Sequence, residues 1–236
     1  MKLPIATRFL SKAGALLVAS FTLASIAKVE AQTAVSNLGQ SSDGSNFWIG
    51  VNATPITEHD TFSFTTGTTA ASFDFTGVTL KFASAAGSAS GLTFGLYSTF
   101  NPSTDVGTGT LLTNLTLTSG DPTVAGTYSL SGSASLLPST TYYLKISADT
   151  TAQGSFYQLS STTSYAESAS LTGWSIQDGL YNWNQGSSNW SLYTGSVPQF
   201  SVEASAIPEP STYAALLGVG VLSFAVWRKR RSIVTG

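Results

Sequence analysis

The stretches VTLKF at residues 78–82 and YYLKI at residues 142–146 indicate the fold of this chain. In both, every second residue is apolar or aromatic, and the residues between them include a lysine. Successive side chains of a β-strand point to opposite faces, so this alternation predicts strands with one buried face. Lys81 and Lys145 are then expected on the solvent side, where a charge also discourages edge-to-edge pairing.

Similar short runs recur from residue 47 to residue 202, separated by Gly, Pro, Asp or Ser. This part of the chain shows no helical period of 3.6 with capping residues and no repeat of fixed length. Many short strands between turn residues are typical of antiparallel sandwiches and barrels. We therefore expect an all-β domain at residues 32–206, an antiparallel β-sandwich of jelly-roll type.

The composition excludes several classes of protein. Aromatic residues make up 11% of the 236 residues, which a disordered chain would lack. The absence of cysteine removes disulfides, thiolate metal sites and thiol nucleophiles. Residues 32–207 hold two lysines against ten acidic residues, a formal charge of −8. Phosphate binding needs a basic surface, so no nucleic-acid partner is expected.

The N-terminus has the three regions of a secretory signal peptide. Three basic residues come first, residues 13–27 carry no charge, and Val29-Glu30-Ala31 is a small-residue cleavage site. The alternative is a retained membrane anchor, which needs about 20 apolar residues and so fits this shorter stretch less well. We predict a signal peptide at residues 1–31 and a mature chain that starts near Gln32.

The C-terminus predicts a single transmembrane helix. Residues 211–227 carry no charge, and as a helix they would be about 25 Å long, just enough for a bilayer core. A basic cluster that holds the cytoplasmic side follows, namely Arg228, Lys229, Arg230 and Arg231. By itself this arrangement is typical of a plain membrane anchor.

The residues before this helix give a more specific interpretation. Pro208, Glu209 and Pro210, followed by the helix and the basic cluster, resemble the PEP-CTERM sorting signal of Gram-negative bacteria, here at residues 207–232. The resemblance implies that an exosortase recognises the tail as a substrate and removes it. It also implies transient anchoring in the inner membrane, and then a location at the cell surface or in the extracellular matrix.

Residues 60–202 resemble the choice-of-anchor domains, in particular the R type. The matching features include Phe64-Thr65-Thr66-Gly67, Gly95-Leu96-Tyr97-Ser98 and Gly173-Trp174-Ser175-Ile176. Members of that family carry one exported β-rich domain before differing C-terminal anchors. The resemblance provides no catalytic residues.

No catalytic, cofactor or metal site is predicted from the residues. The single histidine lies in Thr57-Glu58-His59-Asp60, where a solvated loop is favoured over a metal site because neighbours on a strand face opposite ways. No Gly-x-Ser-x-Gly stands in residues 32–207, and no spacing selects a carboxylate pair for glycoside hydrolysis. Aspartates beside glycines favour turns, with calcium on such loops as the alternative.

Residues 173–195, GWSIQDGLYNWNQGSSNWSLYTG, provide candidate glycan-binding residues, namely Trp174, Tyr181, Trp183 and Trp190. A hairpin turning at residues 184–189 would bring Trp183 near Trp190. Rings beside Asn, Gln and Asp suit a sugar, whose C–H faces stack while its hydroxyls bond to polar groups. The alternative is that the rings fill the core as cross-strand partners.

These patterns predict an exported, exosortase-sorted, non-enzymatic protein. Its expected role is structural or adhesive, at the cell surface or in an extracellular polysaccharide matrix such as a biofilm. One alternative is a carbohydrate-binding module that uses the Trp-rich stretch, with exopolysaccharide as the partner. A hydrolase is the third class.

Overall fold

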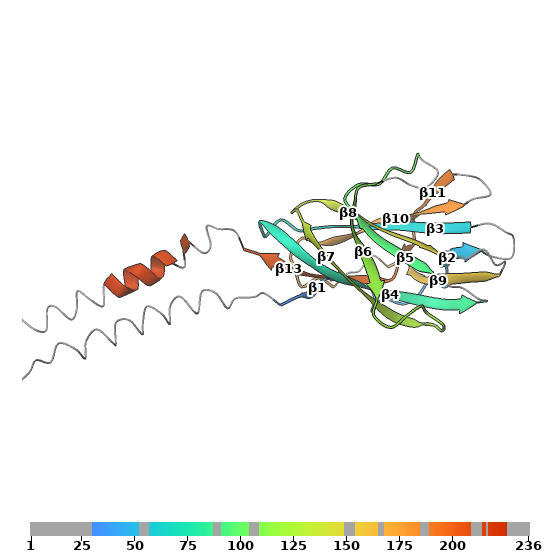
Figure 1. The fold of residues 1–236 in the computed structure, drawn as a ribbon, viewed down its shortest axis with the longest axis horizontal. Helices are drawn as coiled ribbons and strands as arrows, with labels where there is room; N and C mark the ends of the chain where they lie inside the picture. Colours follow the sequence, from blue (N-terminus) through green and yellow to red (C-terminus); the bar gives the residue numbers. More distant parts are fainter. Residues whose placement is uncertain are drawn as a thin grey trace, which may run out of the picture. The chain divides into compact units, whose positions relative to one another are not determined.

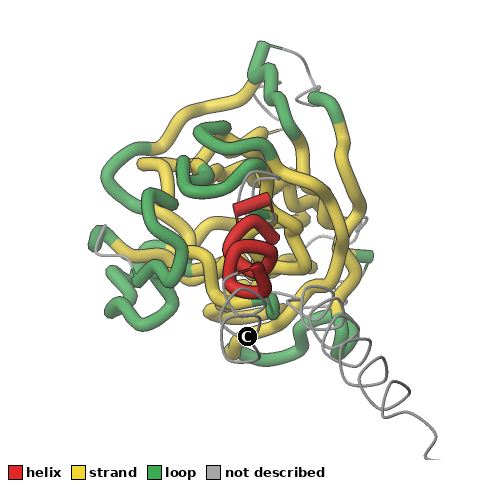
Figure 2. Tube along the Cα trace, turned by 90° about the vertical axis from the view of Figure 1, so that its left-hand side faces the viewer, coloured by secondary structure: helices red, strands yellow, loops and turns green. Residues whose placement is uncertain are grey.

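The computed structural model describes most of the β-rich region and part of the C-terminal segment. Residues 31–207 form one compact unit, which is the subject of this section. In Figure 2 the described part of this unit consists of strands joined by loops and turns. The described residues are 30–51, 57–86, 91–103, 109–148, 154–164, 168–184, 189–208, 214–215 and 217–225.

Thirteen strands make up the described part of this unit, and they belong to one continuous network of paired strands. Their bounds are β1 Gln32–Ser36, β2 Asn46–Val51, β3 Thr57–Thr65, β4 Ser72–Ala86, β5 Leu92–Tyr97, β6 Leu111–Leu117, β7 Gly126–Leu136, β8 Thr141–Ala148, β9 Ser155–Thr162, β10 Ser175–Asn184, β11 Asn189–Tyr193, β12 Val197–Pro198 and β13 Phe200–Ile207.

Eight of these strands close into a barrel-like sheet in the order β4-β7-β6-β5-β8-β3-β2-β9 and back to β4. The fifteen-residue β4 makes the closure, because its first part pairs with β13 while its last part, from Phe82 to Ala86, pairs with β9. On the far side of β9 from β4, β2 follows, and two residue pairs join β2 to β3. These pairings are all antiparallel.

The predicted antiparallel all-β domain is confirmed, but the predicted sandwich is wrong. The alternation of apolar and polar residues distinguishes the two faces of a strand. This pattern is the same in a sandwich and in a barrel. What decides between them is the pairing of β4 with β9, two strands far apart in the sequence, and no local pattern reports it. A closed ring also removes the free edges that a sandwich must protect.

Two ribbons extend the ring. The strands β10 and β11 continue the sheet from β3, beside which they lie in Figure 1, and β13 and β1 continue it from β4. Because β13 lies between β1 and β4, the last strand of the unit is hydrogen-bonded along both edges. The short β12 pairs with β9.

The core is built from the apolar faces that the sequence predicts. Val78 and Leu80 of β4 are at most 2% exposed, and Leu144 and Ile146 of β8 are at most 3% exposed. Burial of a side chain of this size contributes about 1.5–3 kcal/mol relative to leaving it in water. The alternation of VTLKF and YYLKI is therefore confirmed as the division between interior and exterior.

A bulge changes which positions of β4 face inward. Phe73 and Phe75 are buried before it and Val78 after it, and the register against β7 shifts between Phe75 and Gly77. A Cβ atom at position 77 would overlap the backbone oxygen of Leu130. The bulge therefore requires glycine, since only a residue without a side chain allows β7 to approach this closely.

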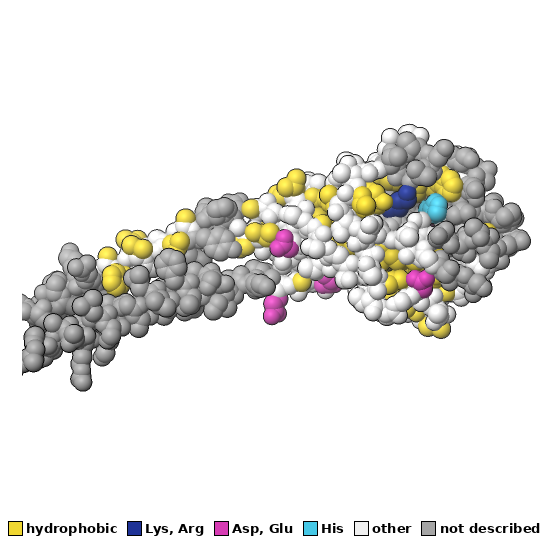
Figure 3. Space-filling view, viewed as in Figure 1, with side chains coloured by type: hydrophobic (Ala, Val, Ile, Leu, Met, Phe, Trp, Pro, Cys, Tyr) yellow, Lys and Arg dark blue, Asp and Glu magenta, His cyan; other side chains and the backbone are white. Residues whose placement is uncertain are grey.

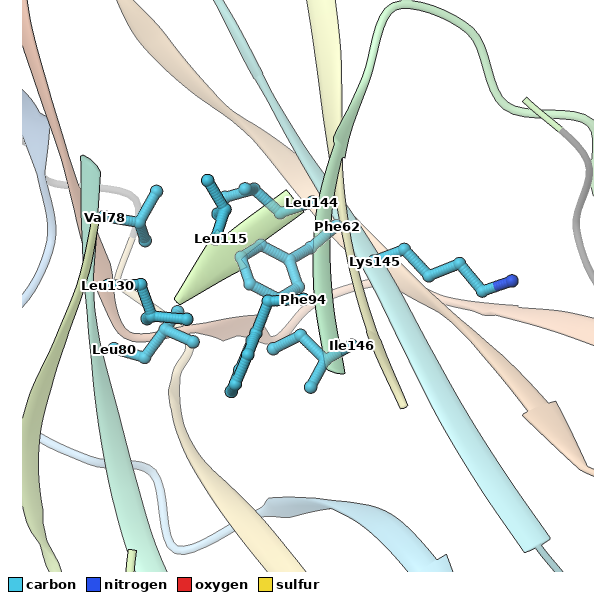
Figure 4. A pocket seen from close by; sticks show the side chains of 9 residues that line it. All are labelled: Phe62, Val78, Leu80, Phe94, Leu115, Leu130, Leu144, Lys145 and Ile146. Carbon is cyan, nitrogen blue, oxygen red and sulfur yellow. The ribbon is translucent and has the colours of Figure 1, made fainter. Parts of the chain in front are cut away.

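The centre of the ring is filled by side chains. A void of about 10 Å³, roughly the size of one water molecule, is lined by apolar side chains from the six strands β3 to β8. Figure 4 shows the side chains that line it. Lys145 borders this void, but its ammonium group extends away from the apolar side chains. This part of the interior therefore offers no room for a ligand.

A buried asparagine fixes the entry into β13. Asn37 is 1% exposed, its Nδ2 donates to the carbonyl oxygen of Pro198 at 2.9 Å, and its Oδ1 accepts from the amide of Phe200 at 2.7 Å. Its backbone amide also donates to the oxygen of Phe200 at 3.1 Å. One side chain thus satisfies two backbone groups that the strand ladders leave unpaired.

Candidate functional site

The β10–β11 hairpin presents a row of aromatic side chains on the outside of the sheet. Trp183 of β10 lies opposite Trp190 of β11, as the sequence predicts, and on its other side Trp183 lies opposite His59 of β3. Tyr181 lies opposite Thr61 of β3. Residues directly opposite one another share a face of the sheet, so these side chains all point outward.

A cluster of four rings forms on this face around Phe100, from the loop after β5. The ring centroid of Phe100 lies 5.7 Å from that of Tyr143, 5.1 Å from that of Tyr181 and 5.0 Å from that of Trp190. At these separations, aromatic pairs stabilise one another by more than the burial of their apolar area provides. All four side chains keep part of their surface in contact with solvent.

Lys145 and His59 border the ring cluster. The ammonium nitrogen of Lys145 lies 5.8 Å from the centroid of Trp190, within the range of a cation–π interaction. His59 stacks on Trp183 with 5.1 Å between ring centroids and 21° between the planes. In Figure 3 a basic side chain and the histidine lie side by side among hydrophobic side chains. We call these seven residues the outer aromatic face, namely His59, Phe100, Tyr143, Lys145, Tyr181, Trp183 and Trp190.

Burial lowers the pKa values of the two basic groups of the outer aromatic face, His59 and Lys145. Desolvation, together with the smaller effect of the positive charge of Lys145, lowers the pKa of His59 to about 4. His59 is therefore neutral at pH 7. Desolvation also lowers the pKa of Lys145, because a half-buried ammonium group is poorly hydrated.

The neighbouring residues of the same strands form a polar cluster on the inner face. Asn182 donates from Nδ2 to Oδ1 of Asp60 at 2.9 Å, and Asn184 donates to Oε1 of Glu58 at 3.3 Å. Asp60 is fully buried, and its Oδ2 has no hydrogen-bond partner among the described residues. Burial raises the pKa of Asp60 well above its ordinary value, against the hydrogen bond from Asn182, and the charge of Glu58 raises it further.

The predicted solvated loop at residues 57–60 is wrong, because these residues belong to β3 and Asp60 is fully buried. The strand places His59 on its outer face and the carboxyl groups of Glu58 and Asp60 on its inner face. This alternation is the reason why the sequence disfavours a metal ion shared by the three residues. Among the described residues, no group of three or more His, Cys, Asp and Glu side chains is placed to hold a metal ion.

The four candidate glycan-binding residues separate into two environments. Trp174 is 4% exposed and lies in the core, stacked 5.7 Å from Phe64 and edge-on 5.1 Å from Phe73, so it does not belong to a surface site. Tyr181, Trp183 and Trp190 belong to the outer aromatic face. Whether those three bind a ligand stays a prediction.

Sequence reasoning missed the other members of the outer aromatic face. Phe100 and Tyr143 lie far from the Trp-rich stretch in the sequence, and only the pairing of β5 with β8, of β8 with β3 and of β3 with β10 brings them to it. The alternation of YYLKI did place Tyr143 and Lys145 on the outside. The sequence carries no signal for which strands would be their neighbours.

The C-terminal segment is described in part. Its described residues are helical at 214–215 and 217–225. Among the described residues, no helix has both the length and the apolar character needed to cross a membrane. Glu209, Pro210 and the basic cluster at 228–231 lie outside the described residues, as does the predicted signal peptide up to residue 29.

Comparison with known protein families gives this segment a function. Residues 206–231 match the PEP-CTERM protein-sorting motif. The motif indicates an exported protein that an exosortase processes in a membrane-associated sorting step. No curated protein matches the chain. A choice-of-anchor domain is not shown by the comparisons, so that resemblance stays a prediction.

Proposed function

We propose that this chain is a non-enzymatic structural or adhesive protein that an exosortase delivers to the cell surface or the extracellular polysaccharide matrix. The sorting motif at residues 206–231 carries the proposal. The signal peptide at residues 1–31 starts export, and the apolar segment at residues 211–227 is a temporary membrane handle that the enzyme removes with the basic cluster.

The position of the motif relative to the fold supports this order of events. Among the described residues, the buried core lies between Ala34 and Ala204, and β13 ends at Ile207, next to Pro208 of the triplet. A cut within or after the triplet therefore removes none of the buried core. Proline disfavours helical backbone at the residue before it, so the sequence Pro-Glu-Pro favours the extended conformation that a protease cleft accepts.

The environment of the titratable groups supports a non-enzymatic role. A general base needs an accessible group with a pKa near the working pH. His59 stacks on Trp183 with a pKa of about 4, and Asp60 is fully buried with a raised pKa. Neither group combines access with a suitable pKa, and this disfavours the hydrolase alternative.

The experiment is to measure the mass of the mature protein in fractions of cells with and without the exosortase. In cells with the exosortase, we expect a mature chain that lacks the C-terminal segment. In cells without it, we expect a chain that keeps this segment and is found in the membrane fraction. Replacement of Pro208, Glu209 and Pro210 by alanine should reproduce the second result in cells that have the enzyme. A chain ending at Gly236 in both kinds of cell refutes the sorting step.

The outer aromatic face favours a second function, the binding of carbohydrate. Its half-buried rings lie outside the core, as the stacking of sugar C–H faces requires. The test is a pull-down with insoluble polysaccharides, in which W183A and W190A should bind less while they keep the circular dichroism of the parent protein. Undiminished binding by both variants argues against this function.

A further inference from the structure

The last strand of the barrel and the sorting motif share two residues. The match to the motif begins at Ala206, whereas β13 ends at Ile207, so these two residues belong both to the strand and to the motif. In the folded domain Ala206 lies opposite Phe73 of β4, and Ile207 lies opposite Ser72. The start of the motif is therefore already bound to the barrel when the enzyme meets it.

The environment of β13 changes at Ala204. Phe200, Val202 and Ala204 are fully buried. Among the described residues, β1 pairs with β13 only as far as Ala204, and residues 205–207 continue the ladder with β4 alone. The side chains of residues 205–207 are partly exposed. A ladder end with one neighbour and little burial opens more easily than a buried strand, so unpairing from the C-terminal end should stop at Ala204.

The triplet is short for a substrate that starts at the rim of a barrel. An extended peptide is commonly bound through its main-chain groups by a strand of its partner. The three residues of the triplet span only about 10 Å when extended, at about 3.3 Å per residue, so a cleft that holds them also meets β4. Unpairing of residues 205–207 doubles the extended length and releases main-chain groups that β4 otherwise occupies.

We propose that residues 205–207 leave β4 when the exosortase binds and enter its cleft together with the triplet, while β13 stays in the barrel up to Ala204. This inference rests on the proposed sorting function and adds the conformational step that precedes the cut. The main-chain groups of Ala206 and Ile207 then bind the enzyme in place of β4. The barrel keeps its core during processing, because the buried part of β13 does not move.

A disulfide between β4 and β13 provides the test. The chain has no cysteine, so the thiols of S72C/I207C can pair within the chain only with one another, and the two positions lie directly opposite. A mild oxidant completes the disulfide, and the mass of the full chain after alkylation confirms it. In cells with the exosortase, we expect the oxidised variant to keep its C-terminal segment and to lose it when a reductant is added.

Three controls separate the pairing with β4 from other effects of the substitutions. S72C and I207C alone change the same side chains and should be processed like the parent protein. T79C/S129C joins β4 to β7, where the two hydroxyl oxygens lie 3.2 Å apart, and should be processed in its oxidised form. A second copy of residues 205–207, inserted before the triplet of oxidised S72C/I207C, should restore processing, because β4 does not hold the inserted residues.

The outcomes separate this inference from the sorting function. Loss of the C-terminal segment from S72C/I207C with its disulfide intact overturns the unpairing and leaves sorting standing, since the enzyme then acts with β4 in place. Retention of the segment by any of the controls also overturns it, because the block then does not come from the pairing with β4. A parent protein that still ends at Gly236 in cells with the exosortase refutes the sorting step itself.

Discussion

Acid should weaken the fold through His59, and replacement of this residue by phenylalanine should remove that weakness. Phenylalanine keeps a ring against Trp183 and cannot take up a proton. The pKa of His59 is about 4 in the folded protein and 6.5 when the side chain is fully hydrated. Because the folded-state pKa is depressed, the unfolded chain binds the proton more readily between these two values. Stability is therefore complete above pH 6.5 and is lost as the pH falls toward 4.

The magnitude follows from the two pKa values. Between pH 7 and pH 5 the linkage relation gives a loss of about 2 kcal/mol for a group with these values. Since the imidazole is only partly buried, we expect about 1–2 kcal/mol, with desolvation as the main cause. Asp60 acts in the opposite direction, because a raised folded-state pKa makes stability fall as the pH rises. Both proteins retain Asp60, so its effect cancels in the difference between them.

The measurement is urea unfolding of the full chain and of H59F in a non-ionic detergent, followed by tryptophan fluorescence at pH 7 and pH 5. The free energy of unfolding of the parent protein relative to that of H59F should drop by about 1–2 kcal/mol on acidification. A difference in the free energy of unfolding that is the same at both pH values does not test the reasoning, because only a change with pH reports the protonation of His59. K145Q is the control and should show a smaller drop, since loss of this positive charge raises the pKa of His59. Parallel pH profiles of the parent protein and H59F refute the reasoning.

Five further substitutions test the fold, each by urea unfolding. W174A removes a core ring and should cost about 3–5 kcal/mol, whereas W190A, at the surface, should cost clearly less; similar costs contradict the division between core and surface. G77A places a methyl group against backbone at the bulge and should cost about 1–3 kcal/mol, and an unchanged stability contradicts the bulge. N37A leaves two buried backbone groups unpaired, at about 1–3 kcal/mol each, and a neutral result contradicts their burial. D60N removes the contribution of Asp60, so its free energy of unfolding relative to that of the parent protein should rise as the pH rises above about 4, and parallel pH profiles contradict the burial of this carboxyl group.

Local patterns in the sequence predict which side of each strand is buried. The alternation in VTLKF and YYLKI places the core residues correctly, because the two faces of a strand depend only on the order of the residues. The pairing of Trp183 with Trp190 follows in the same way from the turn between them. These predictions succeed because each involves residues close together in the chain.

The missed features depend on contacts between distant parts of the chain. Closure of the ring rests on the last residues of β4 and on β9, and the outer aromatic face combines β3, β8 and the β10–β11 hairpin with Phe100. The sequence predicts a solvated loop around His59, but β3 continues through these residues and buries Asp60. A sequence pattern reports the period of a strand and not the identity of its neighbours.

The place of β13 has a mechanical consequence for a protein tethered by its C-terminal end. A pull on Ile207 along the strand acts on the ladders with β1 and β4 at once. Both ladders are then sheared, so their bonds share the load and do not open one by one as in a peeled edge strand. A terminal strand flanked on both sides is thus suited to resist a force applied through its C-terminal end.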